Sequence, residues 1–129
     1  MTDFDLESTF LALDGHGGVA VLPVGPDFWQ TIGSNPKARG SLIGVYPMTV
    51  DWDHWEMHPR GDEVLVLLDG RLELRLDRAG EASFVQMGPG TTCVVPAGVW
   101  HTARVLEPGR LLGITYGEGT SHRPLEATT

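Results

Sequence analysis

Residues 71–77 of this chain alternate charged side chains with leucine without a break. On a β-strand successive side chains point to opposite faces, so Leu72, Leu74 and Leu76 share one face and the charged residues share the other. This pattern predicts a half-buried strand whose leucine face lies towards the core of the domain.

Short apolar segments bounded by Gly, Pro, Asp or Asn recur along a chain that holds 17 glycines and 9 prolines. Such spacing is typical of strands joined by turns. Residues 63–68 are apolar on both faces after the first residue, and Asp69-Gly70 behind them predicts a hairpin turn into the next strand. Residues 26–32 are predicted to form a helical turn. The other predicted strands are 9–13, 19–24, 42–50, 83–87, 91–95, 102–106 and 111–116, and together they predict an all-β sandwich or barrel.

Composition narrows the classes of function. A chain of 129 residues is one domain's worth, and 17 acidic against 9 basic residues give a formal charge of −8, which disfavours nucleic acid as a partner. The single Cys93 excludes an intramolecular disulfide and agrees with a reducing compartment. The acidic N-terminus lacks signal-peptide features, and no apolar stretch approaches the roughly 20 residues that span a bilayer. A cytoplasmic protein without a membrane partner is predicted.

A polar group of side chains follows in the middle of the chain. On an extended strand Trp52, His54, Glu56 and His58 point to one face, while Asp53, Trp55 and Met57 point to the other. Together with Glu63 and His101, Glu56 and His58 supply two imidazoles and two carboxylates that can close around one divalent metal.

Two motifs order these residues. Glu56-x-His58 is followed by four residues, Glu63, six residues and Gly70; later Gly90, five residues, Pro96-x-Gly98, two residues and His101 occur. Over about residues 40 to 116 the chain resembles the cupin superfamily, with Glu56 where that family has its first His. The resemblance implies a jelly-roll barrel (a double-stranded β-helix) and metal ligands at Glu56, His58, Glu63 and His101.

The Glu at position 56 leaves several interpretations open. As a ligand it makes the site harder and more anionic, which favours iron(II) or manganese, with zinc or nickel still compatible. As a non-ligand, Glu56 serves as a catalytic acid or base. The substitution also allows a site without metal, in which these residues only line the barrel and hydrogen-bond. Without metal, burial and mutual repulsion are expected to raise the pKa of the Glu56–Glu63 pair.

Four more residues are predicted to line a pocket for a flat organic substrate, although packing in the core or in an interface is an alternative for each aromatic one: Trp52, His54, Trp100 and Tyr116. Asp62 is interpreted as a solvated turn residue and Cys93 as a buried, inert thiol. His16 and His122 are interpreted as loop histidines, of which His122 can fold over the barrel mouth.

The protein is predicted to be a metal-dependent enzyme that acts on a small organic molecule by oxygen-dependent oxidation, isomerisation or decarboxylation. The alternative is a non-catalytic cupin that binds a metal or small ligand.

Residues 1–40 are expected to pack on, or swap onto, a barrel core of residues 41–116, with residues 117–129 as a loop and tail. A homodimer is predicted, because the resemblance implies one and because Trp55 and Met57 point outward and edge strands need covering.

Overall fold

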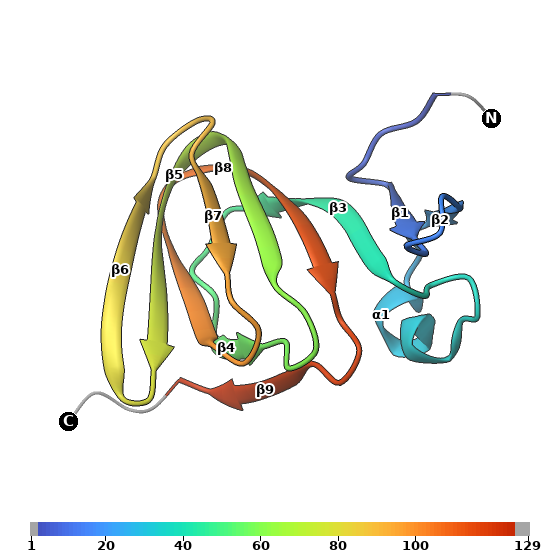
Figure 1. Ribbon diagram of the computed structural model, residues 1–129. Coiled ribbons are helices and arrows are strands. Elements are labelled where there is room, and N and C mark those ends of the chain that lie inside the picture. Colours follow the sequence, from blue (N-terminus) through green and yellow to red (C-terminus); the bar gives the residue numbers. More distant parts are fainter. Residues whose placement is uncertain (1–2, 126–129) are drawn as a thin grey trace.

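The computed structural model describes residues 3–125 and consists mainly of antiparallel β-strands, with one short helix and one 3-10 turn (Figure 1). The helix, residues 28–31, lies within the predicted helical turn at 26–32, and the 3-10 turn follows it at residues 32–34. The elements are β1 (Thr9–Leu13), β2 (Val19–Pro23), α1 (Phe28–Thr31), η1 (Ile32–Ser34), β3 (Ser41–Met48), β4 (His54–Met57), β5 (Glu63–Arg78), β6 (Glu81–Met87), β7 (Thr92–Val95), β8 (Trp100–Tyr116) and β9 (Ser121–Pro124).

The two long strands β5 and β8 form the frame of the fold. They pair antiparallel from Glu63 opposite Thr115 to Asp77 opposite Trp100. On the far side of β5, β6 and β7 continue the sheet; on the far side of β8, β3, β4 and β9 continue it. The sheet curls so that these strands enclose a common interior, which is the predicted jelly-roll barrel (Figure 1).

Both long strands bend at their middle, and this corrects the predicted hairpin. The pairing register shifts on either side of Asp69, and Gly70 has a φ of 83°. A Cβ on Gly70 would lie 2.6 Å from the carbonyl oxygen of Glu107, so only glycine fits this corner. Asp69-Gly70 is therefore a bulge inside β5, because a left-handed glycine suits a bend as well as a turn. In the same way the two strands predicted at 102–106 and 111–116 are one strand, β8.

The interior of the barrel is apolar. Leu72, Leu74 and Leu76 are 1%, 0% and 5% exposed, which confirms the predicted leucine face. They pack with Leu67 and Leu111, which are also buried, and with residues of β3, β6 and β7. At about 25 cal/mol per Å² of apolar surface, this cluster supplies most of the stabilisation of the barrel.

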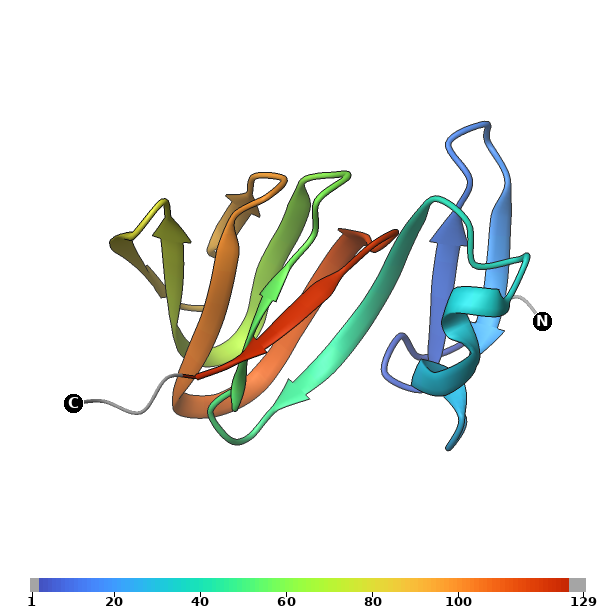
Figure 2. The same cartoon turned by 90° about the horizontal axis from the view of Figure 1, so that it is seen from below.

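The N-terminal segment lies to one side of the barrel and is joined to it through β3 (Figure 2). β1 pairs with β2 and also with the first half of β3. A second apolar cluster of Phe10, Ala12, Leu22 and Phe28 fills the space beneath this hairpin and α1. Tyr46 packs against both clusters, so the barrel and the N-terminal segment share a continuous core.

The C-terminal segment corrects the expected loop. Residues 121–124 form β9, an edge strand that pairs antiparallel with β4. The Arg123 guanidinium lies 5.0 Å from the ring centre of Trp55 and 4.6 Å from that of Trp100, and donates to Asp77 at 2.8 Å. Trp55 is thereby 6% exposed. Its outward face is covered by β9 of the same chain, and it does not offer the dimer contact expected from the sequence.

Residues 126–129 of the predicted tail lie outside the described residues. Within the described part, no helix is long and apolar enough to cross a membrane.

Candidate metal centre

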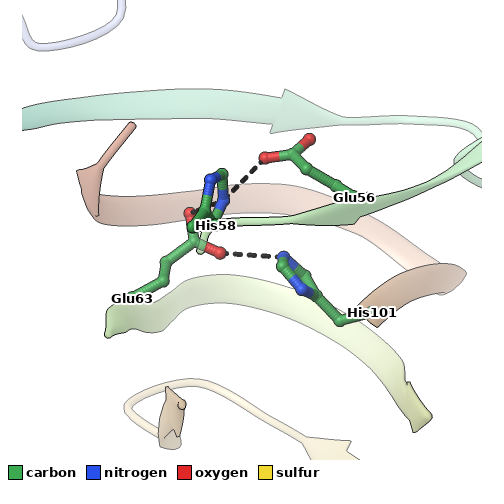
Figure 3. A group of neighbouring side chains, drawn as sticks. All are labelled: Glu56, His58, Glu63 and His101. Atoms are coloured by element: carbon green, nitrogen blue, oxygen red, sulfur yellow. Dashed lines mark ion pairs between the residues drawn. The ribbon is translucent and has the colours of Figure 1, made fainter. Parts of the chain in front are cut away.

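Four side chains converge at one end of the barrel interior (Figure 3). Glu56 lies on β4 opposite His101 of β8, His58 follows β4 directly, and Glu63 begins β5. His58 Nε2 lies 2.9 Å from Glu56 Oε1 and 3.3 Å from Glu63 Oε2, and His101 Nε2 lies 2.9 Å from Glu63 Oε1. His58, Glu63 and His101 are buried, whereas Glu56 is 22% exposed and marks the open side. The structure thus brings together the four residues singled out as ligands.

The hydrogen bonds behind the two imidazoles fix which nitrogen faces the cluster. Thr120 donates its hydroxyl hydrogen to the carbonyl of Gly117 at 2.7 Å, so its oxygen accepts from Nδ1 of His58 at 2.7 Å. Nδ1 of His101 donates to the carbonyl of Val99 at 3.1 Å. In a neutral imidazole with a protonated Nδ1, Nε2 carries the lone pair. In its neutral form each histidine therefore presents an Nε2 lone pair to the cluster, as metal-bound histidines do.

Three atoms of the cluster are buried without a hydrogen-bond partner: His58 Nε2, Glu63 Oε1 and His101 Nε2. They are close to one another, and no hydrogen lies between them while both imidazoles are neutral and protonated on Nδ1. Buried polar atoms are rarely left in this state; a proton on an imidazole satisfies them in the metal-free protein, and a metal cation between them would satisfy all three. The two carboxylates balance the charge of one divalent ion, so these residues fit a metal of this class.

The charged side chains of the cluster lower the pKa values of its two carboxylates, whereas the sequence led us to expect raised values. Burial alone would raise the pKa of Glu63, but His101 and His58 outweigh it and hold the pKa at about 2. Burial likewise disfavours ionised Glu56, yet His58 keeps its pKa below the usual value. Burial would lower the pKa of His58, but Glu56 and Glu63 raise it to about 9. The carboxylates stay ionised because imidazoles lie between them, which the sequence order did not reveal.

The connections around the cluster are tied together by the backbone. Gly98, at a φ of 81°, donates its N–H to the carbonyl of His58 at 2.9 Å. Asp62 accepts from the N–H of Ala97 at 2.9 Å, so the predicted turn residue also holds the opposite loop. Thr115 on β8 donates to Glu63 at 2.5 Å. The loops before β5 and β8 are thereby held in a fixed relation, which orients Glu63 and His101.

Tyr46 is a residue near the cluster that sequence reasoning missed. Burial, and then the negative charges of Glu63 and Glu56, raise the pKa of its phenol above the usual value. The phenol therefore remains protonated. No motif identifies this residue, since only the pairing of β3 with β8 places it there.

The predicted pocket residues divide into two groups. Trp52 stacks on His54 with ring centres 6.1 Å apart, and it lies 6.0 Å from the ring of His101. Trp100, by contrast, is adjacent to inward-pointing His101 and packs under Arg123. Tyr116 follows the Glu63-bound Thr115, packs beside Gly61 and donates to Glu118 at 3.3 Å.

Trp100 and Tyr116 therefore lie on the strand face turned away from the cluster, against expectation. Trp52 and His54 remain as candidate pocket residues, because they line an open hollow formed by residues 47–54. Cys93 is half-buried, and burial raises the pKa of its thiol, which agrees with an unreactive side chain.

Residues 44–115 match the sequence family of the cupin domain, and this match spans more than half of the chain. The chain belongs to the cupin family. A comparison with curated proteins found no match.

Solved structures share the fold at low sequence identity. A cupin-2 domain containing protein from Shewanella frigidimarina NCIMB 400 is 21% identical, with 58% of this chain and 69% of that chain covered and a TM-score of 0.50. Hydroxypropylphosphonic acid epoxidase from S. wedmorenis is 16% identical, with 58% and 42% covered and a TM-score of 0.51. Hydroquinone 1,2-dioxygenase PnpCD, solved with Cd2+ and 4-hydroxybenzonitrile, is 17% identical, with 59% and 57% covered and a TM-score of 0.50.

This chain therefore spans about half the length of the epoxidase chain and of the hydroquinone dioxygenase chain. Sequence identities at this level establish a shared fold alone.

Proposed function

We propose that this cupin holds one divalent metal through Glu56, His58, Glu63 and His101 and oxidises a small organic molecule with oxygen. The observation that carries the proposal is the set of buried Nε2 and carboxylate atoms that face one another without a hydrogen-bond partner. Two carboxylates among four donors favour iron(II) or manganese over softer ions. The related epoxidase was solved with iron(II), and the related hydroquinone dioxygenase acts on an aromatic diol, which supports the same class of chemistry.

A bound metal of this kind supplies Lewis acidity and a template on which substrate and oxygen meet. The chain's own residues supply the rest. Glu56, the most exposed of the four, lies on the open side, where its carboxylate would accept a substrate proton. Trp52 offers a flat apolar surface beside His54 for an aromatic or planar substrate.

Metal content decides the first half of this proposal. Protein purified without added metal is expected to contain about one iron or manganese ion per chain, and His58→Ala and His101→Ala variants to lose it. His16 lies exposed in a distant loop, so His16→Ala is the matched control and keeps the metal. Unchanged metal content in both ligand variants would refute the site.

Oxygen uptake decides the second half. Phenolic, diketone and thiol compounds are offered to the metal-loaded protein, and at least one class is expected to raise oxygen consumption above that of the His101→Ala variant. A protein that binds metal but consumes no oxygen with any class would refute the oxidation and leave an isomerase, a decarboxylase or the non-catalytic binder.

We further propose that the protein forms a homodimer through its N-terminal segment. Among the described residues, edge strand β2 pairs on one side only and exposes Val19 and Val21 at 59% and 42%; Trp29 of α1, which stacks on Tyr46, is 58% exposed. A second copy pairing at this edge would cover these side chains. Light scattering at tens of micromolar tests it: a mass near 14.0 kDa would exclude the dimer, and Val21→Lys should convert a dimer into folded monomers.

A further inference from the structure

Glu56 faces two different sets of imidazoles with its two oxygens. Oε1 lies 2.9 Å from His58 Nε2 inside the metal centre. Oε2 lies 3.6 Å from His54 Nε2 and 3.7 Å from His122 Nε2 on the open side. The second set comes from two strands, since β4 carries His54 and Glu56 and β9 places His122 directly opposite Glu56. Antiparallel pairing sends these three side chains to the same face of the sheet.

The separations in this outer set distinguish a metal site from a hydrogen-bonded one. Hydrogen bonds between nitrogen and oxygen fall at about 2.7–3.2 Å, so 3.6 and 3.7 Å are too long. Two donors bound at about 2.1 Å to one tetrahedral ion lie about 3.4 Å apart. The ligand atoms of His54, Glu56 and His122 also all lie within 4.8 Å of one another. Their spacing therefore fits one cation shared by three donors.

His54 is oriented for this role. Its Nδ1 lies 2.7 Å from the carboxylate of Asp53 and donates to it, which leaves the lone pair on Nε2. The parallel stack on Trp52, with an angle of 7° between the rings, fixes the plane of the imidazole. A histidine whose far nitrogen donates to a carboxylate is the usual arrangement behind a zinc-bound imidazole.

We propose that His54, His122 and Oε2 of Glu56 form a second, outer site for a divalent cation such as Zn2+, and that Glu56 bridges this ion to the inner metal centre. Two imidazoles and one carboxylate suit zinc, and the exposure of His54 (36%) and His122 (58%) leaves room for water as a further ligand. Because the donors come from β4 and β9, the ion also ties the C-terminal edge strand to the barrel. The site goes beyond the proposed function and shares only Glu56 with it.

Zinc stoichiometry tests the proposal. After dialysis against micromolar Zn2+, the metal-free protein is expected to bind about two ions per chain, because zinc also enters the inner centre. His54→Ala and His122→Ala variants should each bind about one ion per chain, and the His16→Ala control about two. About one ion in the wild type, or about two in both outer variants, would overturn the outer site. Circular dichroism confirms that each variant is folded.

The two sites fail independently. His101→Ala removes a donor of the inner centre alone, so it should retain about one ion, which a further His122→Ala change should release. If His101→Ala still binds two ions, the inner centre is wrong, whereas the outer site stands if His122→Ala removes one.

Hydrogen exchange gives a readout that does not depend on stoichiometry. Zinc is expected to slow amide exchange in residues 121–123 in the wild type and in His101→Ala, and not in His122→Ala. Equal exchange with and without zinc in the wild type would count against an ion that links β4 to β9.

Discussion

Raising the pH from about 6 to about 8.5 should destabilise the metal-free protein while leaving the metal-bound protein nearly unchanged. Glu56 and Glu63 raise the pKa of His58 from 6.5 to about 9 in the folded chain. A raised pKa contributes stability that is complete below the unfolded pKa and disappears as the pH passes the folded pKa. Glu63, with its pKa lowered from 4.5 to about 2, contributes above 4.5 and loses its contribution in acid. The metal-free protein should therefore be most stable between these two unfolded values.

The size of the effect follows from the shift of His58. The difference between 6.5 and about 9 corresponds to about 3 kcal/mol in full, of which about 2 kcal/mol is lost between about pH 6 and about pH 8.5. The lowered pKa of Glu63 reflects the same ion pairs, so the two contributions are not added. Cys93 contributes little in this window, because its pKa is raised above an ordinary value of 9.0. In the metal-bound protein the metal replaces the proton on His58, so this loss is absent.

Urea denaturation of chelator-treated protein at the two pH values measures the difference in unfolding free energy. The matched variant is His58→Gln, which keeps a polar side chain of similar reach but has no proton to lose, and its pH dependence should be weaker by about 2 kcal/mol. Equal stability of metal-free wild type at both pH values would refute the reasoning, as would an equal loss in His58→Gln.

Other changes test single contacts. Glu56→His should shift the preference of the inner centre from manganese towards zinc, measured as a ratio of affinities by competition with a chelating dye; an unchanged ratio would mean that Glu56 is not a ligand. Thr120→Val removes the acceptor of His58 Nδ1 and should weaken metal binding by about 10–100-fold, with the fold intact. Arg123→Ala should destabilise the protein by about 1–3 kcal/mol in urea, because two indole rings and Asp77 lose their partner. Its control, Arg104→Ala, removes one exposed ion pair and should cost under about 1 kcal/mol; equal losses would contradict the role of Arg123.

Much of the fold and of the candidate site could be predicted because the relevant signals are local. The alternation of Leu72 and Leu74 specifies a strand and its buried face without reference to any partner. The two motifs place Glu56, His58, Glu63 and His101 at positions that the structure brings within reach of one another. Gly98, a position of the second motif, has the positive φ that a turn before His101 needs.

The errors arose where the answer depends on a distant strand. Asp69-Gly70 satisfies a hairpin turn and a bulge equally well, and only pairing with residues near Glu107 selects the bulge. The region around His122 carries no strong alternation, so its pairing with β4 as β9 could not be foreseen. Alternation says that Trp100 and His101 face opposite ways, yet which of them faces the interior depends on how β8 pairs with β4 and β5.

The sequence by itself determined the class of fold and singled out the four residues that the structure brings together, because strand alternation and motif spacing act over a few residues and need no knowledge of the partner. Tertiary structure decided the protonation and the surroundings of that set. It placed Thr120 behind His58, Tyr46 beside the carboxylates and His122 opposite Glu56. These residues come from β3, β9 and the loop before β9, and only the closure of the barrel brings such separated segments into contact, since side-chain neighbours across strands are set by pairing register and not by position along the chain.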